Sequence, residues 1–117
     1  MRESKSTYTK GLLAEKLVIE HYQILNYRLL GQRIRTPFSE VDLIFENDQS
    51  RLMVEVKLIA NWNNIQGRIG SIQKKRLLKA YHYLSLRSQK PLVFNAVFID
   101  NQGHIWSTEI DFGARRT

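Results

Sequence analysis

Two carboxylates and a lysine, Asp42, Glu55 and Lys57, are the residues of this sequence best placed to do chemistry together. Asp42 lies in segment 39–46, whereas Glu55 and Lys57 lie in segment 51–59, and both segments alternate between polar and apolar residues. The turn-forming sequence Asn-Asp-Gln-Ser separates them, which predicts a β-hairpin. If that sequence forms the loop, Asp42 pairs with Glu55, with Cβ atoms about 4.5 to 5.5 Å apart, on the side that also carries Lys57.

Such a pair of carboxylates predicts a metal site. Two carboxylates that face one another repel unless positive charge lies between them, and Lys57 supplies only part of that charge. Carboxylate oxygens are hard ligands that suit Mg²⁺ or Mn²⁺. An ion held by Asp42 and Glu55 could activate a water and offset charge on a phosphate, while Lys57 assists deprotonation of the water or stabilises the pentavalent phosphorus. The pattern therefore predicts metal-assisted phosphodiester hydrolysis.

Two further carboxylates extend the predicted site. The same strand pairing places Glu40 opposite Lys57. Glu15 falls between Ile19 and Tyr22 on the face of a predicted helix, and a carboxylate flanked by apolar groups needs a partner. The alternative is a solvated strand face with a weak ion pair, and a Glu15 that reaches solvent or pairs with a nearby base.

The elements that must hold these residues are a helix, two or three strands, a second helix and two strands. The first helix is predicted over 9–26, and the apolar residues of its expected buried face are Leu13, Leu17, Ile24 and Leu25. The other expected elements are an edge strand at 27–34, a loop at 60–70, a helix from an N-cap at Ser71 to about Arg87, and strands at 92–99 and 105–109. The expected core is the apolar side of the hairpin, which pairs Val41 with Val56, Leu43 with Val54 and Phe45 with Leu52. This order predicts one α/β domain over 1–117, with a mixed central sheet flanked by helices and flexible tails at 1–8 and 113–117.

Charge is distributed unevenly along the chain. The formal net charge is +7, yet no Asp or Glu occurs between positions 56 and 99, where 8 Lys and Arg residues fall. The rest of the chain carries 10 basic and 11 acidic residues. A concentrated positive field suits a polyanion, because neutralised phosphates release condensed counterions. The alternative is a basic surface that serves solubility.

The second helix carries much of this positive charge. Lys75, Arg76, Lys79 and Tyr83 share one face of it, and Leu77, Tyr81 and Leu84 share another. The residues expected to contact DNA are Arg68, Gln73, Lys74, Lys75, Arg76 and Lys79. Trp62 and Tyr83 could stack on bases, although packing is the commoner role of such residues.

Composition disfavours other classes of protein. The chain has no cysteine for disulfides or thiolate ligands, and its three histidines lack the spacing of a zinc site. No apolar run approaches the roughly 20 residues that a membrane span requires. We therefore expect a cytoplasmic protein with no membrane partner.

Three segments resemble the YraN-type family within the PD-(D/E)XK nuclease superfamily. They are Gly11 to Glu15, Ser39-Glu40-Val41-Asp42-Leu43-Ile44 and Met53-Val54-Glu55-Val56-Lys57, against a family pattern of Glu, then Gly-Glu-Ile-Asp, then Val-Glu-Val-Lys. The match in order extends roughly from 10 to 99. The resemblance implies a restriction-endonuclease-like α-β-β-β-α-β core, Mg²⁺ dependence and DNA cleavage, with branched or structured DNA as a candidate substrate, as in archaeal junction resolvases. Carried over residue by residue, it implies Asp42 and Glu55 as metal ligands, Lys57 as the catalytic lysine, and Glu15 and Glu40 as auxiliary carboxylates.

Two departures from the family pattern bear on activity. Ser39 stands where the family has Gly, and Val93-Phe94-Asn95-Ala96 stands where it has Arg-Phe-Asp-Val, which removes a charge pair. If that pair is structural, Asn95 keeps a hydrogen bond and the fold survives, whereas a pair that supports the site would put activity in doubt. Two other functions stay open, namely a non-catalytic DNA-binding module that keeps the nuclease fold and an RNA-directed nuclease. A resolvase would also need two sites, which predicts a homodimer.

Overall fold

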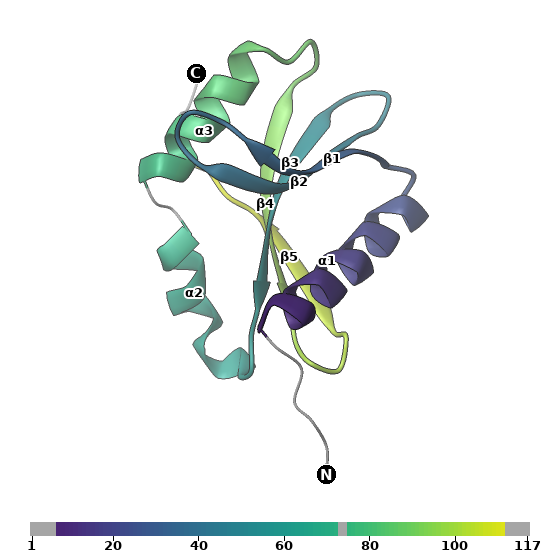
Figure 1. Ribbon diagram of the computed structural model, residues 1–117, viewed down its shortest axis with the longest axis vertical. Coiled ribbons are helices and arrows are strands. Elements are labelled where there is room, and N and C mark those ends of the chain that lie inside the picture. Colours follow the sequence, from purple (N-terminus) through teal and green to yellow (C-terminus); the bar gives the residue numbers. More distant parts are fainter. Residues whose placement is uncertain (1–6, 73–74, 112–117) are drawn as a thin grey trace.

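Five strands form one mixed sheet whose spatial order, β1-β2-β3-β4-β5, follows the order of the chain. The computed structural model describes residues 7–72 and 75–111 (Figure 1). Its elements are α1 (Thr7–Ile24), β1 (Arg28–Arg35), β2 (Glu40–Glu46), β3 (Arg51–Leu58), the 3-10 helix η1 (Trp62–Asn64), α2 (Ile65–Ile72), α3 (Lys75–Leu86), β4 (Leu92–Ile99) and β5 (Ile105–Glu109). Only the β3–β4 pair is parallel, because η1, α2 and α3 form the crossover between those strands. This is the expected α/β class and a restriction-endonuclease-like α-β-β-β-α-β core, with β5 added at the edge.

The hairpin that carries the predicted site has the expected register. Leu43 pairs with Val54 and Phe45 with Leu52, so paired residue numbers sum to 97 as the four-residue loop predicts. The Asn47 side chain fixes that loop, since its Oδ1 accepts hydrogen bonds from the Gln49 and Ser50 amides, both at 2.9 Å. Loop length was enough to determine the register of residues 43–46 against residues 51–54.

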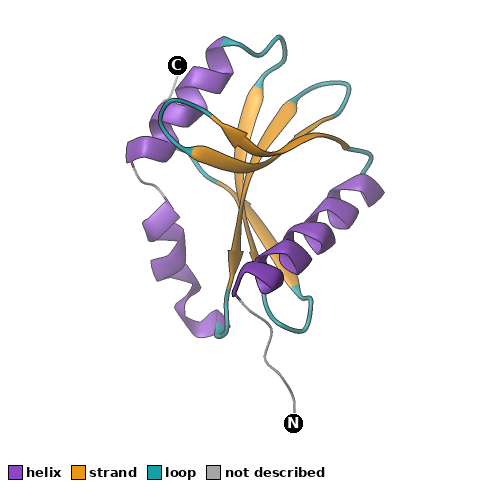
Figure 2. Cartoon of the chain, in the orientation of Figure 1, coloured by secondary structure: helices purple, strands orange, loops and turns teal. Residues whose placement is uncertain are grey.

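Both faces of the sheet are buried, whereas the sequence had indicated a core on one side only. Figure 2 shows α1 on one side of the strands and α2 and α3 on the other. The α1 side contains Val18, Tyr22, Leu43, Phe45, Leu52, Val54 and Val97. The α3 side contains Met53, Leu77, Ala80, Phe94, Ala96 and Phe98, and also Val41, which was expected to pack with Val56. The predicted charged side of the hairpin therefore lies at the margin of a second apolar core rather than on an open surface.

The buried face of α1 differs from the predicted one. Ala14, Val18 and Tyr22 face the sheet, with exposures of 3% or less, while Leu13 and Leu17 are 42% exposed. Ile24 and Leu25, also predicted to be buried, are 80% and 52% exposed. The helix carries apolar residues on more than one stripe, so periodicity could not select the stripe that packs.

Residues 60–70 are mostly helical, which corrects the predicted loop. The Asn61 side chain caps η1 by accepting a hydrogen bond from the Asn63 amide at 2.8 Å. Ile65 and Ile69, four residues apart, then pack α2 against the α3-side core. Ser71 lies inside α2 and is not the N-cap of the following helix. The Asn and Gly content of this segment predicts a loop, whereas the packing of its two isoleucines stabilises a helix.

The remaining elements agree with the predictions. β1 is the expected edge strand, and its register against β2 shifts between Leu29 and Gly31. The strands at 92–99 and 105–109 have the predicted bounds. The predicted tails lie outside the described residues, except for Thr7 and Tyr8, which begin α1. None of the described helices is long and apolar enough to cross a membrane.

Candidate active site

Asp42 lies where β2 separates from β3. The backbone pairing of these strands ends at Leu43 and Val54, one residue short of Asp42 and Glu55. The Asp42 carboxylate takes the place of the next strand partner, since its Oδ2 accepts a hydrogen bond from the Val56 amide at 2.7 Å. The Asp42 and Glu55 carboxyl groups are also within hydrogen-bonding reach of each other. The hairpin therefore brings the two predicted metal ligands together, and the Val56 amide fixes the orientation of the Asp42 carboxylate.

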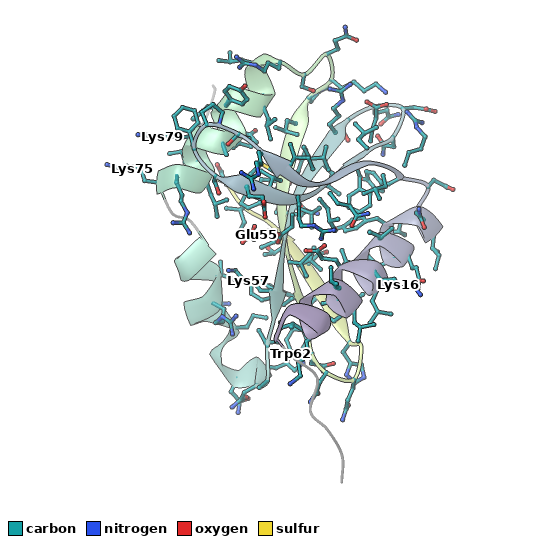
Figure 3. All side chains as sticks on the ribbon, viewed as in Figure 1. Lys16, Glu55, Lys57, Trp62, Lys75 and Lys79 are labelled. Carbon is teal, nitrogen blue, oxygen red and sulfur yellow. The ribbon has the colours of Figure 1, made fainter. Side chains whose placement is uncertain are left out.

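Lys57 adds a cation beside Glu55. Its Nζ lies 3.5 Å from the Glu55 Oε2, and the Lys57 and Glu55 side chains are 32% and 16% exposed. Figure 3 shows both residues at the centre of the molecule, between α1 on one side and α2 on the other. The lysine can therefore reach a ligand while it remains in contact with the carboxylate.

The auxiliary carboxylates take different positions from the predicted ones. Glu40 pairs with Arg35 of β1, rather than standing opposite Lys57, and is exposed. Glu15, on the side of α1 nearest the hairpin, has a partner in Arg33, whose Nη1 lies 2.5 Å from the Glu15 Oε1. Burial and then the Asp42 carboxylate raise the pKa of Glu15, and Glu40 adds a lesser contribution to the rise that burial causes in the pKa of Asp42.

The site holds more negative charge than its own cations offset. Burial and then the Asp42 carboxylate raise the pKa of Glu55 to about 7, although Lys57 acts in the opposite direction. Burial also raises the pKa of Asp42, in spite of the Val56 amide, and raises that of Glu15. Carboxyl groups at a sheet margin with raised pKa values are typical of sites that bind a cation or handle protons.

The donor set fits a hard divalent cation that keeps part of its hydration shell. Asp42 and Glu55 offer oxygen atoms, and the excess negative charge would be relieved by an ion such as Mg²⁺. Within residues 7–72 and 75–111, no three His, Asp or Glu side chains form a group that could hold a metal ion. The protein would thus supply part of a coordination shell and leave the rest to water and substrate, which is the usual habit of Mg²⁺.

The predicted DNA-contacting residues divide into two groups. Lys75, Arg76 and Lys79 are exposed on α3, whose buried residues are Leu77 and Ala80. Arg68 is half-buried and donates from Nη2 to the Leu58 carbonyl at 3.1 Å, so it ties α2 to the end of β3. Gln73 and Lys74 lie outside the described residues.

Sequence reasoning missed two residues on the segments that lead to the site, Arg33 in β1 and Phe38 in the β1–β2 turn. Arg33 has a φ of 48°, a left-handed conformation uncommon for a residue with a side chain, next to the irregular part of β1. Phe38 is 42% exposed in the β1–β2 turn and contacts Tyr83 of α3. Neither belongs to a spacing pattern, because each meets its partner only through the tertiary fold.

The two departures from the family pattern do not disturb the carboxylate pair. Asn95 points to the α1 side of the sheet, where its Nδ2 donates to the Tyr22 hydroxyl at 3.1 Å. Ser39 has no left-handed backbone that would demand glycine, and its amide donates to the Thr36 Oγ1 at 3.0 Å. Asn95 therefore keeps a structural hydrogen bond on the face opposite Glu55.

A mixed sheet in which a separating strand pair brings together Asp, Glu and Lys defines the class of protein, a restriction-endonuclease-like α/β domain. Within this class, the chain belongs to the uncharacterised protein family UPF0102, whose model matches residues 14–99 and confirms the YraN-type resemblance. Those residues include all five predicted catalytic positions.

Relatives in this family cover most of the chain. A UPF0102 protein of Psychromonas ingrahamii is 31% identical over 103 residues, which are 84% of this chain and 84% of that protein. A UPF0102 protein of Thermus thermophilus is 34% identical over 92 residues, covering 77% and 82% of the two chains. A third, from Granulibacter bethesdensis, is 27% identical over 99 residues, covering 81% and 63%.

Proposed function

We propose that this protein is a metal-dependent endonuclease that hydrolyses phosphodiester bonds in DNA. The observation that supports the proposal most directly is the pairing of Asp42 and Glu55 at the point where β2 leaves β3, with the Lys57 Nζ 3.5 Å from Glu55. Two partly buried carboxylates that repel each other do not stabilise the fold, so a purely structural role does not account for them. A site that must bind a divalent cation requires them.

Asp42 and Glu55 would hold Mg²⁺ or Mn²⁺. When bound, such an ion supplies positive charge against the phosphate and lowers the pKa of a water molecule. The Val56 amide keeps the Asp42 carboxylate in one orientation, so its second oxygen is free to face the ion. Burial of Glu55 limits the water around it, which strengthens its interaction with any cation.

Lys57 would act on the substrate directly. Its ammonium group is partly exposed and lies beside Glu55, so it can donate a hydrogen bond to a phosphate oxygen or accept a proton at Nζ once its own proton has passed to solvent. The Arg33 guanidinium, next to Glu15, is a further donor at the α1 side of the site. The two cations would offset charge that develops on the phosphate in the transition state.

DNA would reach this centre across the exposed face of α3. Lys75 and Lys79 project outward from that helix in Figure 3, to one side of Glu55 and Lys57. Lysines on a helix face contact phosphates without reading sequence. A homodimer, which a substrate with two cleavage points would require, stays a prediction.

A cleavage panel tests the proposal. The protein is incubated with linear, flapped and four-way DNA, with and without Mg²⁺ or Mn²⁺. Asp42→Asn and Lys57→Ala should lower the cleavage rate by about 100-fold or more while DNA binding persists. Asp48→Asn, in the exposed hairpin loop, and Lys16→Ala, on the exposed side of α1, are matched controls that should cleave normally. Equal activity in Asp42→Asn, Lys57→Ala and the wild type would contradict the proposal.

A non-catalytic DNA-binding module is the second candidate. One observation favours it, since the exposed Lys75, Arg76 and Lys79 of α3 could bind phosphates whether or not the carboxylates hold a metal ion. This candidate predicts salt-sensitive DNA binding without metal-dependent cleavage, unchanged by Asp42→Ala. Matched DNA and RNA substrates in the same panel would reveal an RNA-directed nuclease instead.

A further inference from the structure

We propose that Phe38, supported by Tyr83, is a stacking platform for an unpaired base of the DNA substrate. The inference rests on the proposed function and adds a substrate class to it, namely DNA with single-stranded nucleotides beside the cleaved bond. It is carried by an aromatic ring that the fold holds at the surface beside Lys79, in the β1–β2 turn that leads into the strand of Asp42.

The turn that carries Phe38 is held by hydrogen bonds to its backbone and not by burial of the Phe38 ring. The Thr36 Oγ1 accepts hydrogen bonds from the Phe38 amide at 3.1 Å and from the Ser39 amide at 3.0 Å. The Thr36 amide in turn donates to the Ser39 carbonyl at 3.0 Å, and Pro37 restricts the backbone between them. The phenyl ring is left 42% exposed. A binding surface needs such preorganisation, whereas the core does not need this side chain.

Phe38 and Tyr83 form a pair of rings with a cation at each end. The Lys79 Nζ lies 5.9 Å from the centroid of the Phe38 ring, and the Tyr83 ring packs edge-on at 6.1 Å between centroids. The Arg87 guanidinium lies over the Tyr83 ring at 3.7 Å. Proteins that bind single strands combine aromatic rings, on which bases stack, with cations that track the phosphates. The row formed by Lys79, Phe38, Tyr83 and Arg87 has both components.

The platform is close to the candidate active site along the chain. Phe38 precedes Asp42 by four residues. At about 3.3 Å per extended residue, the two lie no more than roughly 13 Å apart along the backbone. If a phosphate of a DNA strand contacts the carboxylate pair, a base close to it in that DNA strand could therefore stack on Phe38. In a duplex that base would be stacked and paired, so only an unpaired one is available to the ring.

Trp62, the other aromatic residue considered for stacking, has a different role. Its Nε1 donates to the Asp100 Oδ2 at 2.9 Å, and its ring packs against the α3-side core. It therefore anchors η1 to the turn between β4 and β5. Phe38 offers the exposed ring in the turn that leads into β2, the strand of Asp42.

Equilibrium binding separates stacking from general attraction to DNA. A duplex and the same duplex with a single-stranded flap, which carries 2-aminopurine next to the junction, are titrated in Ca²⁺ so that binding is measured without cleavage. The wild type should bind the flapped DNA more tightly and quench the 2-aminopurine fluorescence. Phe38→Ala should weaken binding of the flapped DNA about tenfold, abolish the quenching and leave the duplex affinity unchanged, whereas Phe38→Trp should retain both signals.

Leu86→Ala is the matched control, because Leu86 is an 84% exposed apolar side chain at the end of α3. It should bind both DNAs as the wild type does. Unchanged flap affinity in Phe38→Ala overturns the platform, and so does an equal loss for duplex and flap, which would indicate insertion between paired bases instead. If the platform is overturned in either way but the wild type cleaves DNA normally, the proposed nuclease function still stands. Flap-selective binding without cleavage would overturn the nuclease and support the platform, and a wild type that binds neither DNA overturns both.

Discussion

At the scale of single residues, protonation of Glu55 should govern the stability of the metal-free protein. The pKa of Glu55 is raised from its ordinary value of 4.5 to about 7, so between these values the folded state binds more protons than the unfolded state. Stability must then fall as the pH rises across this window. We expect the free energy of unfolding to drop by about 1 to 3 kcal/mol between pH 5 and pH 8, on the order of what such a shift allows. Urea denaturation at a series of pH values measures it.

Glu55→Gln should flatten most of that dependence, because the amide has no proton to lose. Asp42 and Glu15 act in the same direction, so a smaller slope should remain. Glu20→Gln, an exposed change on α1, is the control and should keep the wild-type slope. A wild type whose stability is flat or rises over this range would show that Glu55 ionises freely in the folded protein.

A divalent cation should reverse this trend. Because the cation competes with protons for Asp42 and Glu55, its binding should strengthen as the pH rises through about 7. When Mg²⁺ is at about tenfold its dissociation constant, the expected stabilisation is about 1.4 kcal/mol. Thermal denaturation with and without Mg²⁺ at pH 6 and pH 8 measures it, and Asp42→Asn should abolish the gain. Equal stabilisation at both pH values, or in Asp42→Asn, would place the ion elsewhere.

That the Asp42 and Glu55 side chains come together could be predicted because the side-chain period of a strand and the length of the loop leave few alternatives, although the backbone pairing stops one residue short of them. The partners of Glu15 and Glu40 could not. Arg33 reaches Glu15 from an edge strand whose irregular register depends on its neighbours, and Glu40 pairs with Arg35 rather than facing Lys57. Contacts within one hairpin are encoded locally, whereas contacts between α1 and β1 require the assembled fold.

At the scale of elements, the bond between Asn95 of β4 and Tyr22 of α1 should serve structure and not catalysis. It lies on the sheet face opposite Glu55. Asn95→Ala should lower the free energy of unfolding by about 1 kcal/mol, the usual net contribution of one hydrogen bond, and leave the cleavage rate unchanged. Urea denaturation and the cleavage assay measure the two effects, with the exposed Gln23→Ala on α1 as the control. A variant of normal stability that cleaves slowly would instead connect Asn95 to the site.

Elements with one dominant pattern could be predicted, and those with competing patterns could not. β2, β3, β4 and β5 follow alternation or an apolar run bounded by turns. In α1, two apolar stripes compete, and packing against Phe45 selects the one with Val18 and Tyr22. In α2, the glycines lower the intrinsic helix propensity, so the sequence alone predicts a loop. The helix is stabilised in the fold because Ile65 and Ile69 pack against the sheet. Tertiary burial decides both cases.

At the scale of the whole molecule, the uneven charge of the sequence becomes a difference between faces. Lys75 and Lys79 lie on the exposed side of α3, and Lys16 lies on α1 across the sheet (Figure 3). The two helices cover opposite faces of the sheet, so one continuous DNA segment that crosses α3 should not also engage α1. Binding to DNA should therefore depend on which lysine is removed and not only on the net charge.

Salt dependence distinguishes these faces. The logarithm of the DNA association constant should fall linearly with the logarithm of the salt concentration, with a slope of about 0.9 per neutralised phosphate of a duplex. Replacing both Lys75 and Lys79 by Gln should reduce that slope by about 1.8, whereas Lys16→Gln, which also removes a positive charge, should leave it unchanged. Fluorescence anisotropy over a range of salt concentrations measures the slopes. If Lys16→Gln lowers the slope as much per charge as the α3 variant, the DNA is attracted by the total charge of the protein, and α3 is not its docking face.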